Sequence, residues 1–196
     1  MPLFTVEWGG AGGHWDEILE EFKGREVSAL EVGTFQGKSA IWFLDNILTH
    51  PSATLTCVDT FEGLYRYSDA KNGYSDDYEI SLLELCKSNL KEYPNVKIVQ
   101  GKSRDVLCKL DEKYDFIYID GDHRASYVLE DAVLAFRLLK FGGIMIFDDY
   151  LWQDPKYPKP EDAPKLGIDC FLKAFKGRYV DVFQGWQYSI RKISSL

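Results

Sequence analysis

Short apolar runs alternate with helical patterns along most of the chain, and this alternation constrains the fold more than any other feature. The runs are rich in β-branched and aromatic residues, which is typical of buried strands. Strands are predicted at 27–32, 54–58, 96–99, 114–119 and 144–147. Helices are predicted at about 14–23, 38–48, 78–91, 104–110 and 126–139, with Gly142 and Gly143 ending the last one. This order predicts a doubly wound α/β fold, in which helices cover both faces of a mostly parallel sheet.

The C-terminal part departs from this order. After a helix near 167–176, two strands are predicted at 179–183 and 187–193. Only the tripeptide 184–186 joins them, so they must form an antiparallel hairpin. The prediction is therefore a seven-stranded, mostly parallel sheet with one reversed C-terminal strand. A length of 196 residues without repeats or low-complexity linkers predicts a single domain over 1–196.

Composition excludes several classes of function. The chain has 23 basic and 31 acidic residues, a net charge of −8, and it lacks a basic run. Nucleic-acid binding and docking on an anionic membrane are therefore not expected. No apolar stretch approaches the roughly 20 residues that span a bilayer, and no secretory signal is visible. The widely spaced cysteines are expected to be free thiols in a cytoplasmic protein. They are Cys57, Cys86, Cys108 and Cys170.

Two long connections, 60–77 and 150–166, follow predicted strands directly. Both are therefore expected over the carboxyl edge of the sheet, where open α/β folds bind ligands. The first is rich in tyrosine and the second contains Trp152. Acceptor binding, a homodimer contact and simple surface insertion all remain open for these segments.

Residues 31–39, EVGTFQGKS, lead from the first strand into a helix. A glycine-containing turn at this place lets the backbone approach a ligand closely. The spacing matches neither the dinucleotide fingerprint nor a Walker loop. Two further positions follow neighbouring strands: Asp59 could accept the hydroxyls of a ribose, and Ser103 could border a base. Alternatively, the first motif is only a tight turn, Asp59 caps a turn, and Ser103 is the N-cap of its helix.

Acidic residues follow two other strands that are expected to be neighbours. Asp120 ends the fourth strand and Asp148 and Asp149 end the fifth, so the three carboxylates should converge. Such a cluster favours a hard divalent cation, Mg²⁺ first, although the aspartates could also cap the following segments. His123 lies three residues after Asp120 and could act as a general base, or serve a structural role.

In combination, the segments EVGTFQGKS, IDGDH and LLKFGGIMIFDDY resemble the class I S-adenosylmethionine-dependent methyltransferases over about residues 14–193. Within that superfamily the chain is similar to the macrocin and cephalosporin-tailoring O-methyltransferases, which are related to metal-dependent catechol-type enzymes. The resemblance implies a Rossmann-like methyltransferase fold and the following roles. S-adenosylmethionine would contact Glu31, Gly33, Gly37, Ser39, Asp59, Ser103 and Asp120. Mg²⁺ would be held by Asp120, Asp148 and Asp149, and catalysis would use His123 together with Asp120.

The activity that the resemblance implies is metal-assisted O-methylation of a small-molecule hydroxyl, such as a sugar diol or a catechol-like compound. An NAD-dependent oxidoreductase on a Rossmann-like sheet is one alternative, although the glycine fingerprint is incomplete. A non-catalytic cofactor-binding module that uses its aromatic loops for protein contacts is the other. The acceptor itself cannot be read from the motifs.

Overall fold

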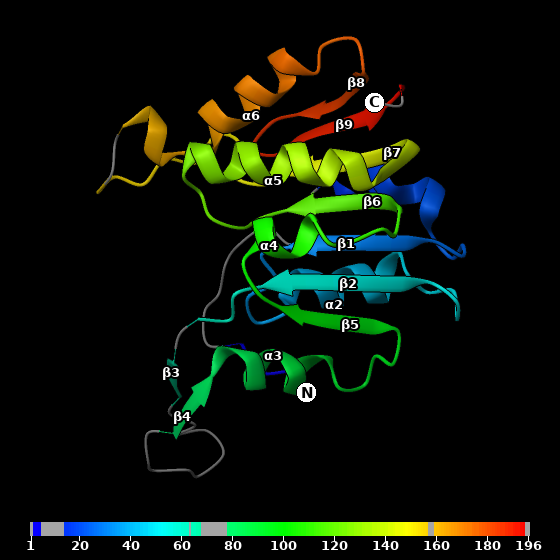
Figure 1. The fold of residues 1–196 in the computed structure, drawn as a ribbon. Coiled ribbons are helices and arrows are strands. Elements are labelled where there is room, and N and C mark those ends of the chain that lie inside the picture. The colour runs from blue at the N-terminus through cyan, green and yellow to red at the C-terminus, as the bar shows by residue number, and fades with distance from the viewer. Residues whose placement is uncertain (1, 5–13, 63, 68–77, 157–158, 195–196) are drawn as a thin grey trace.

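The computed structural model describes residues 2–4, 14–62, 64–67, 78–156 and 159–194 (Figure 1). Its centre is one seven-stranded sheet. Across the sheet the strands are β5 (Val96–Gln100), β2 (Thr54–Asp59), β1 (Ser28–Val32), β6 (Tyr114–Ile119), β7 (Leu139–Phe147), β9 (Tyr188–Lys192) and β8 (Tyr179–Gln184). Strand β9 is antiparallel to both of its neighbours, whereas all other pairings in the sheet are parallel. The predicted sheet with one reversed C-terminal strand is confirmed.

Helices cover both faces of this sheet. One layer contains α1 (Trp15–Leu19) with the 3₁₀ turn Glu20–Phe22, α2 (Lys38–Asn46) and α3 (Leu82–Leu90). The opposite layer contains α4 (Ser103–Leu107), α5 (Ala125–Leu138) and α6 (Pro164–Ala174), the last preceded by the 3₁₀ turn Pro160–Asp162. In Figure 1, α5 crosses in front of the sheet and α2 lies behind it.

Strand β1 shows why the sheet needs both layers. Ala29 packs into the core with α1 and α2, while the next residue, Leu30, packs into the core with α5. Both side chains are fully buried, as expected for a central parallel strand whose residues alternate between two covered faces. Residues after the carboxyl ends of β1, β2, β6 and β7 therefore gather at one edge, where the loops carry the predicted site.

The prediction that Gly142 and Gly143 end a helix at 126–139 is wrong. Helix α5 ends at Leu138, and Leu139 already begins β7 with an extended backbone. The two glycines lie within β7, where its pairing with β6 shifts register between Tyr114 and Phe116. Gly142 has a φ of 79°, and a Cβ at Gly143 would lie 2.7 Å from the Asp115 carbonyl oxygen. An irregular strand and a helix C-terminus make similar demands for glycine, which explains the error.

The predicted helix at 78–91 is shorter than expected. Residues Tyr78–Ser81 form β4, which pairs antiparallel with β3 (Leu64–Tyr67) in a separate two-stranded sheet. The helix begins at Leu82 because the Ser81 hydroxyl accepts a hydrogen bond from the Glu84 backbone N–H and donates one to the Glu84 carboxylate. Residues 63 and 68–77 of the tyrosine-rich connection lie outside the described residues.

All four cysteines lie in the described residues as free thiols, but only two of them are buried as expected. Cys57 and Cys86 are buried free thiols, while Cys108 and Cys170 are exposed and also unpaired. Among the described residues, none of the helices combines the length and apolar character needed to cross a membrane.

Lys192 is a buried lysine that caps the end of α5, and its replacement by methionine is expected to destabilise the fold. Its ammonium group donates to the carbonyl oxygens of Phe136 and Leu139, each at 2.8 Å, and its side chain is only 5% exposed. Without a donor these carbonyls stay buried and unsatisfied, which costs about 1–3 kcal/mol. Lys113→Met is the matched control, because exposed Lys113 donates to the Arg137 carbonyl. Urea denaturation should show a loss below about 0.5 kcal/mol in that variant; equal losses would contradict the argument.

Candidate functional site

Hydrogen bonds between backbone groups continue past the ends of the central strands and align the loops that follow. The N–H of Gly33 donates to the Val58 carbonyl at 2.8 Å, and the N–H of Asp120 donates to the Val32 carbonyl at 2.8 Å. The N–H of Asp148 donates to the Ile119 carbonyl at 3.0 Å in the same way. The loops after β1, β2, β6 and β7 are thus adjacent at the carboxyl edge.

The glycine loop after β1 needs glycine at two positions. Gly33 has a φ of 91°, and a Cβ there would lie 1.8 Å from the Asp120 carbonyl oxygen. Gly37 has a φ of 85° and forms the N-cap of α2 in the left-handed conformation. Between them Phe35 also has a positive φ of 51°, which is uncommon for a bulky residue. The backbone turns tightly here and brings the start of α2 beside Asp120.

Glu31 lies under this loop and is completely buried. Its carboxylate accepts hydrogen bonds from the Ser39 hydroxyl and, at 3.6 Å, from the Cys57 thiol. Burial raises the pKa of Glu31 to about 7, although the Ser39 hydrogen bond opposes that rise. The hydrogen bond between Glu31 and Ser39, both predicted site residues, therefore joins the end of β1 to the first turn of α2.

Asp59 connects two loops at the end of β2. One carboxylate oxygen accepts from the Phe35 N–H at 2.8 Å, and the other accepts from the Phe61 N–H at 2.7 Å. The turn-capping alternative for Asp59 is thus part of its role. Each carboxylate oxygen has a second lone pair, so Asp59 can still accept a hydroxyl of a bound molecule.

Ser103 is the first residue of α4 rather than its N-cap, which is Lys102. Its hydroxyl hydrogen-bonds to Asp131 on α5, a side chain that is only 2% exposed. Burial raises the pKa of Asp131 to about 6, and the Ser103 hydrogen bond acts against that rise. Asp131 therefore contacts Ser103, and it was not among the site residues predicted from the sequence.

Three titratable side chains converge after β6 and β7. One ligand atom each from Asp120, His123 and Asp149 lies within 4.8 Å of the others. The His123 Nε2 is 3.6 Å from Asp120 Oδ1 and 3.4 Å from Asp149 Oδ2. The structure thus brings together three of the four residues predicted for catalysis and metal binding.

Asp148, the fourth, is joined to the same group through a tyrosine. The Tyr118 hydroxyl is 2.7 Å from Asp148 Oδ2 and 3.3 Å from Asp120 Oδ2. Burial raises the pKa of Tyr118 well above its ordinary value, so Tyr118 stays a neutral donor between the two carboxylates. The predicted ligand set of three aspartates remains a prediction, because Asp148 makes its contacts on the Tyr118 side of the cluster.

Charges in the cluster perturb one another strongly. Desolvation by the surrounding protein raises the pKa of Asp120 to about 8, and the carboxylates of Asp148 and Asp149 contribute to that rise. Although desolvation favours neutral imidazole, the neighbouring carboxylates raise the pKa of His123 above its usual value. The cluster therefore gathers several carboxylates around His123, and such oxygen-rich donors suit a hard divalent cation.

A family model described as a methyltransferase domain matches residues 30–150, more than half of the chain. The chain belongs to this methyltransferase family. The matched region contains the glycine loop, Asp59, Ser103 and both acidic strand ends, so the predicted resemblance to class I methyltransferases is confirmed.

Relatives of this methyltransferase are distant. The uncharacterized protein R132 of Acanthamoeba polyphaga mimivirus is 23% identical over 151 residues, which are 77% of this chain. The chain spans 62% of the length of that curated relative.

Solved methyltransferases share the fold at low identity. The O-methyltransferase TomG from Streptomyces achromogenes, in complex with SAM, has a TM-score of 0.66 at 19% identity, covering 95% of this chain and 82% of TomG. MycE from the mycinamycin pathway, in complex with Mg and SAH, has a TM-score of 0.62 at 14% identity, covering 92% and 48%. An rRNA methylase from Streptococcus thermophilus has a TM-score of 0.64 at 10% identity, covering 96% and 100%. Since the fold accommodates such different acceptors, the expected lack of nucleic-acid binding stays a prediction.

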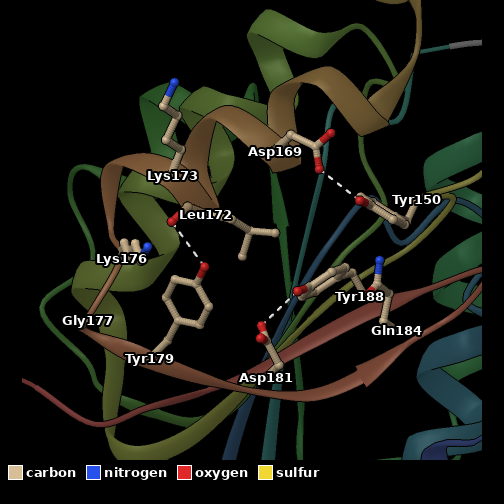
Figure 2. Close-up of a pocket in the computed structure, with 10 residues that line it drawn as sticks. All are labelled: Tyr150, Asp169, Leu172, Lys173, Lys176, Gly177, Tyr179, Asp181, Gln184 and Tyr188. Carbon is tan, nitrogen blue, oxygen red and sulfur yellow. Dashed lines mark hydrogen bonds between the residues drawn. The ribbon is translucent and has the colours of Figure 1, made fainter.

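Apart from the acidic cluster, a cavity with a volume of about 470 Å³ lies between α6 and β8 (Figure 2). Three tyrosine hydroxyls line it, and each is already hydrogen-bonded within the protein. Tyr150 donates to Asp169, Tyr188 donates to Asp181, and Tyr179 donates to the Leu172 carbonyl oxygen. Because its three tyrosine hydroxyls are already bonded, this cavity is a weaker candidate than the acidic cluster.

Replacing Glu31 with glutamine is expected to flatten the pH dependence of stability of the methyltransferase. In the unfolded chain Glu31 loses its proton near pH 4.5, whereas the folded protein keeps it until about pH 7. The folded state then binds more protons, so the free energy of unfolding falls as the pH rises through this window, by up to about 3 kcal/mol for this group. Urea denaturation at several pH values within the window measures the slope. An unchanged slope in Glu31→Gln would contradict the assignment.

Proposed function

We propose that the chain is an S-adenosylmethionine-dependent O-methyltransferase that methylates a small-molecule hydroxyl with the help of a divalent cation. One observation carries the proposal: the glycine loop and the acidic cluster are in direct contact, because Gly33 packs against the backbone of Asp120. A methyl donor bound along the glycine loop would therefore present its methyl group beside Asp120 and His123.

The cofactor would be held by the loops at the ends of β1, β2 and β5. Glu31, Gly33, Gly37 and Ser39 would surround its methionine part, and Asp59 would accept from its ribose hydroxyls. Ser103, held by Asp131, would border the adenine, and Asp120 would lie near the methyl group. TomG, which is bound to SAM, shares this fold over 95% of the chain, and this supports the assignment.

The cation would be Mg²⁺, held by Asp120, Asp148 and Asp149. The residues present fit this ion, because one oxygen each of Asp120 and Asp149 lies within 4.8 Å of the other beside His123, and the Tyr118 hydroxyl contacts both Asp120 and Asp148. When bound, Mg²⁺ would chelate two neighbouring oxygens of the acceptor and acidify the hydroxyl to be methylated. MycE, which is bound to Mg and SAH, supports the same choice.

The protein's own residues have a limited chemical task, because the sulfonium methyl group is already an activated electrophile. The acceptor oxygen must be aligned with the methyl group and must lose its proton. His123 would take that proton, and the resulting imidazolium would be stabilised by Asp120 and Asp149, whose carboxylate oxygens lie 3.6 and 3.4 Å from its Nε2. The acceptor O–H bond breaks, an O–CH₃ bond forms, and S-adenosylhomocysteine leaves. A vicinal diol of a sugar or a catechol would suit such a site.

The proposal is tested by measuring cofactor binding and methyl transfer separately. Calorimetry with S-adenosylhomocysteine should show binding, whereas NADH should give no signal. Transfer of a labelled methyl group to a panel of catechols, sugar diols and RNA should require Mg²⁺, stop with EDTA and return when Mg²⁺ is added. Full transfer in EDTA would remove the cation from the proposal.

A non-catalytic cofactor-binding module is the second candidate, because the short sequence motifs that bind a cofactor do not require turnover. Tight binding of S-adenosylhomocysteine without transfer to any acceptor of the panel would favour that module. Binding of NADH instead of S-adenosylhomocysteine would contradict both candidates.

A further inference from the structure

The turn of the C-terminal hairpin, residues 185–187, contacts both consecutive aspartates of the acidic cluster. Gln187 Nε2 donates to Asp148 Oδ1 at 2.7 Å, and Trp186 Nε1 donates to Asp149 Oδ1 at 3.2 Å. In each aspartate the other oxygen, Oδ2, is on the side of the cluster: that of Asp148 accepts from Tyr118 and that of Asp149 lies 3.4 Å from His123. In each aspartate, one carboxylate oxygen is thus hydrogen-bonded to the turn and the other lies on the side of the cluster.

The orientation of Gln187 is itself fixed from the far end of the chain. Trp15 on α1 donates its indole N–H to Gln187 Oε1 at 2.7 Å. A side-chain amide has one oxygen and one NH₂ group, and an indole N–H can only donate. Trp15 therefore requires the oxygen of Gln187 on its side, so the NH₂ group must face Asp148.

Trp186 constrains an aspartate whose backbone is strained. Asp149 has a φ of 54°, a conformation that a non-glycine residue rarely adopts. Next to it, the N–H of Leu151 donates to the Trp186 carbonyl at 3.4 Å, so Trp186 contacts the segment after β7 with both backbone and side chain. The indole N–H then limits rotation of the Asp149 carboxylate.

We infer that Gln187 and Trp186 are positioning residues, which set the direction of the Asp148 and Asp149 carboxylates for the bound cation. The inference rests on the proposed function, because it assumes that the cluster holds a divalent ion. Residues that orient metal ligands without touching the metal change metal affinity about 10–100-fold when they are replaced. The reversed direction of β9 makes the arrangement possible, since it returns the hairpin turn to the carboxyl edge of the sheet.

The test measures the affinity for Mn²⁺, a paramagnetic substitute for Mg²⁺, by electron paramagnetic resonance in the full chain. Gln187→Leu keeps the approximate size of the side chain and removes its hydrogen bonds, and Trp186→Phe keeps an aromatic ring and removes the N–H. Each variant is expected to bind Mn²⁺ about 10–100-fold more weakly than the natural chain. Trp15→Phe keeps an aromatic ring against Tyr118 and removes the N–H that orients Gln187, so it should cause a smaller loss in the same direction.

Two controls separate positioning from a general loss of structure. Gln184→Leu changes a glutamine of the same hairpin that lines the cavity between α6 and β8, and it should leave Mn²⁺ affinity unchanged. Binding of S-adenosylhomocysteine should stay within about 3-fold of normal in Gln187→Leu and Trp186→Phe, because neither variant changes the glycine loop or Asp59. A 3-fold change in affinity corresponds to about half of the 1.4 kcal/mol of a tenfold change.

The outcomes distinguish the inference from the proposed function. If the natural chain binds Mn²⁺ and Gln187→Leu and Trp186→Phe bind it equally well, the positioning role is wrong and the cation site stands. If the natural chain does not bind Mn²⁺, the cation in the proposed function fails, and the inference fails with it. A variant that loses both Mn²⁺ and S-adenosylhomocysteine binding would indicate a structural role and would also overturn the inference.

Discussion

Asp120→Asn is expected to lose methyl transfer and cation binding while the protein keeps its stability. Asp120 contacts two other residues of the cluster, because one of its carboxylate oxygens faces His123 and the other lies 3.3 Å from the Tyr118 hydroxyl. Asparagine cannot supply the negative charge that a divalent cation and a protonated imidazole both need. We expect transfer to fall about 10²–10⁴-fold, the range for loss of general acid–base assistance, in an assay with saturating Mg²⁺.

The stability of Asp120→Asn, unlike its methyl transfer, should not decrease. Desolvation raises the pKa of Asp120 to about 8, so the carboxyl group of the free protein is mostly protonated at neutral pH, and asparagine resembles that neutral form. The melting temperature of Asp120→Asn should therefore not fall. Asp122→Asn is the matched control, because Asp122 forms an ion pair with Arg124, which holds the pKa of that carboxyl low. If both variants lost transfer equally, the special position of Asp120 would be refuted.

Gly33→Ala is expected to destabilise the fold by about 4 kcal/mol or more and to abolish cofactor binding. The added Cβ would lie 1.8 Å from the carbonyl oxygen of Asp120, a residue whose backbone is held because its N–H donates to the Val32 carbonyl. The φ of 91° adds strain of its own. A buried clash combined with backbone strain belongs to the few mechanisms that exceed about 4 kcal/mol. Urea denaturation and calorimetry with S-adenosylhomocysteine measure the two effects.

Gly177→Ala provides the comparison that separates the clash from the strain. Gly177 has a φ of 83°, close to that of Gly33, but a Cβ there would meet no atom within 4 Å. This variant should lose only about 1–2 kcal/mol, the cost of a left-handed residue with a side chain. If Gly33→Ala lost no more than Gly177→Ala, the close contact between the glycine loop and Asp120 would be wrong.

Most of the sheet could be predicted from local pattern. The strand ends at Val32, Ile119 and Phe147 agree with the prediction because each apolar run is followed by glycine or aspartate, although β7 begins at Leu139 and not at the predicted 144. The errors arose where one residue type serves two structures. Gly142 and Gly143 satisfy an irregular strand as well as a helix C-terminus, and the choice depends on the partner strand β6, which lies about 30 residues earlier in the chain.

Some residues of the candidate site could also be predicted from the sequence, whereas others could not. Asp59, Asp120 and Asp148 could be predicted as neighbours, because each ends a strand and adjacent parallel strands end at one edge. Tyr118 could have been identified as a buried tyrosine directly before that edge, but its bonds to two carboxylates depend on side-chain direction. Gln187 and Trp186 gave no signal, since a glutamine or tryptophan in a short turn has no preferred partner in the sequence.

The bond between Trp15 and Gln187 also has a consequence for how the protein becomes competent during synthesis. It joins positions 172 residues apart, so it cannot form until Gln187 has left the ribosome. Contacts of such long range also form late in folding, because closing a large loop costs entropy before any contact is gained. The residues proposed to hold the cofactor, from Glu31 to Asp120, are all synthesised before Gln187. Under the proposed function they would therefore be present before the residue that orients the Asp148 carboxylate.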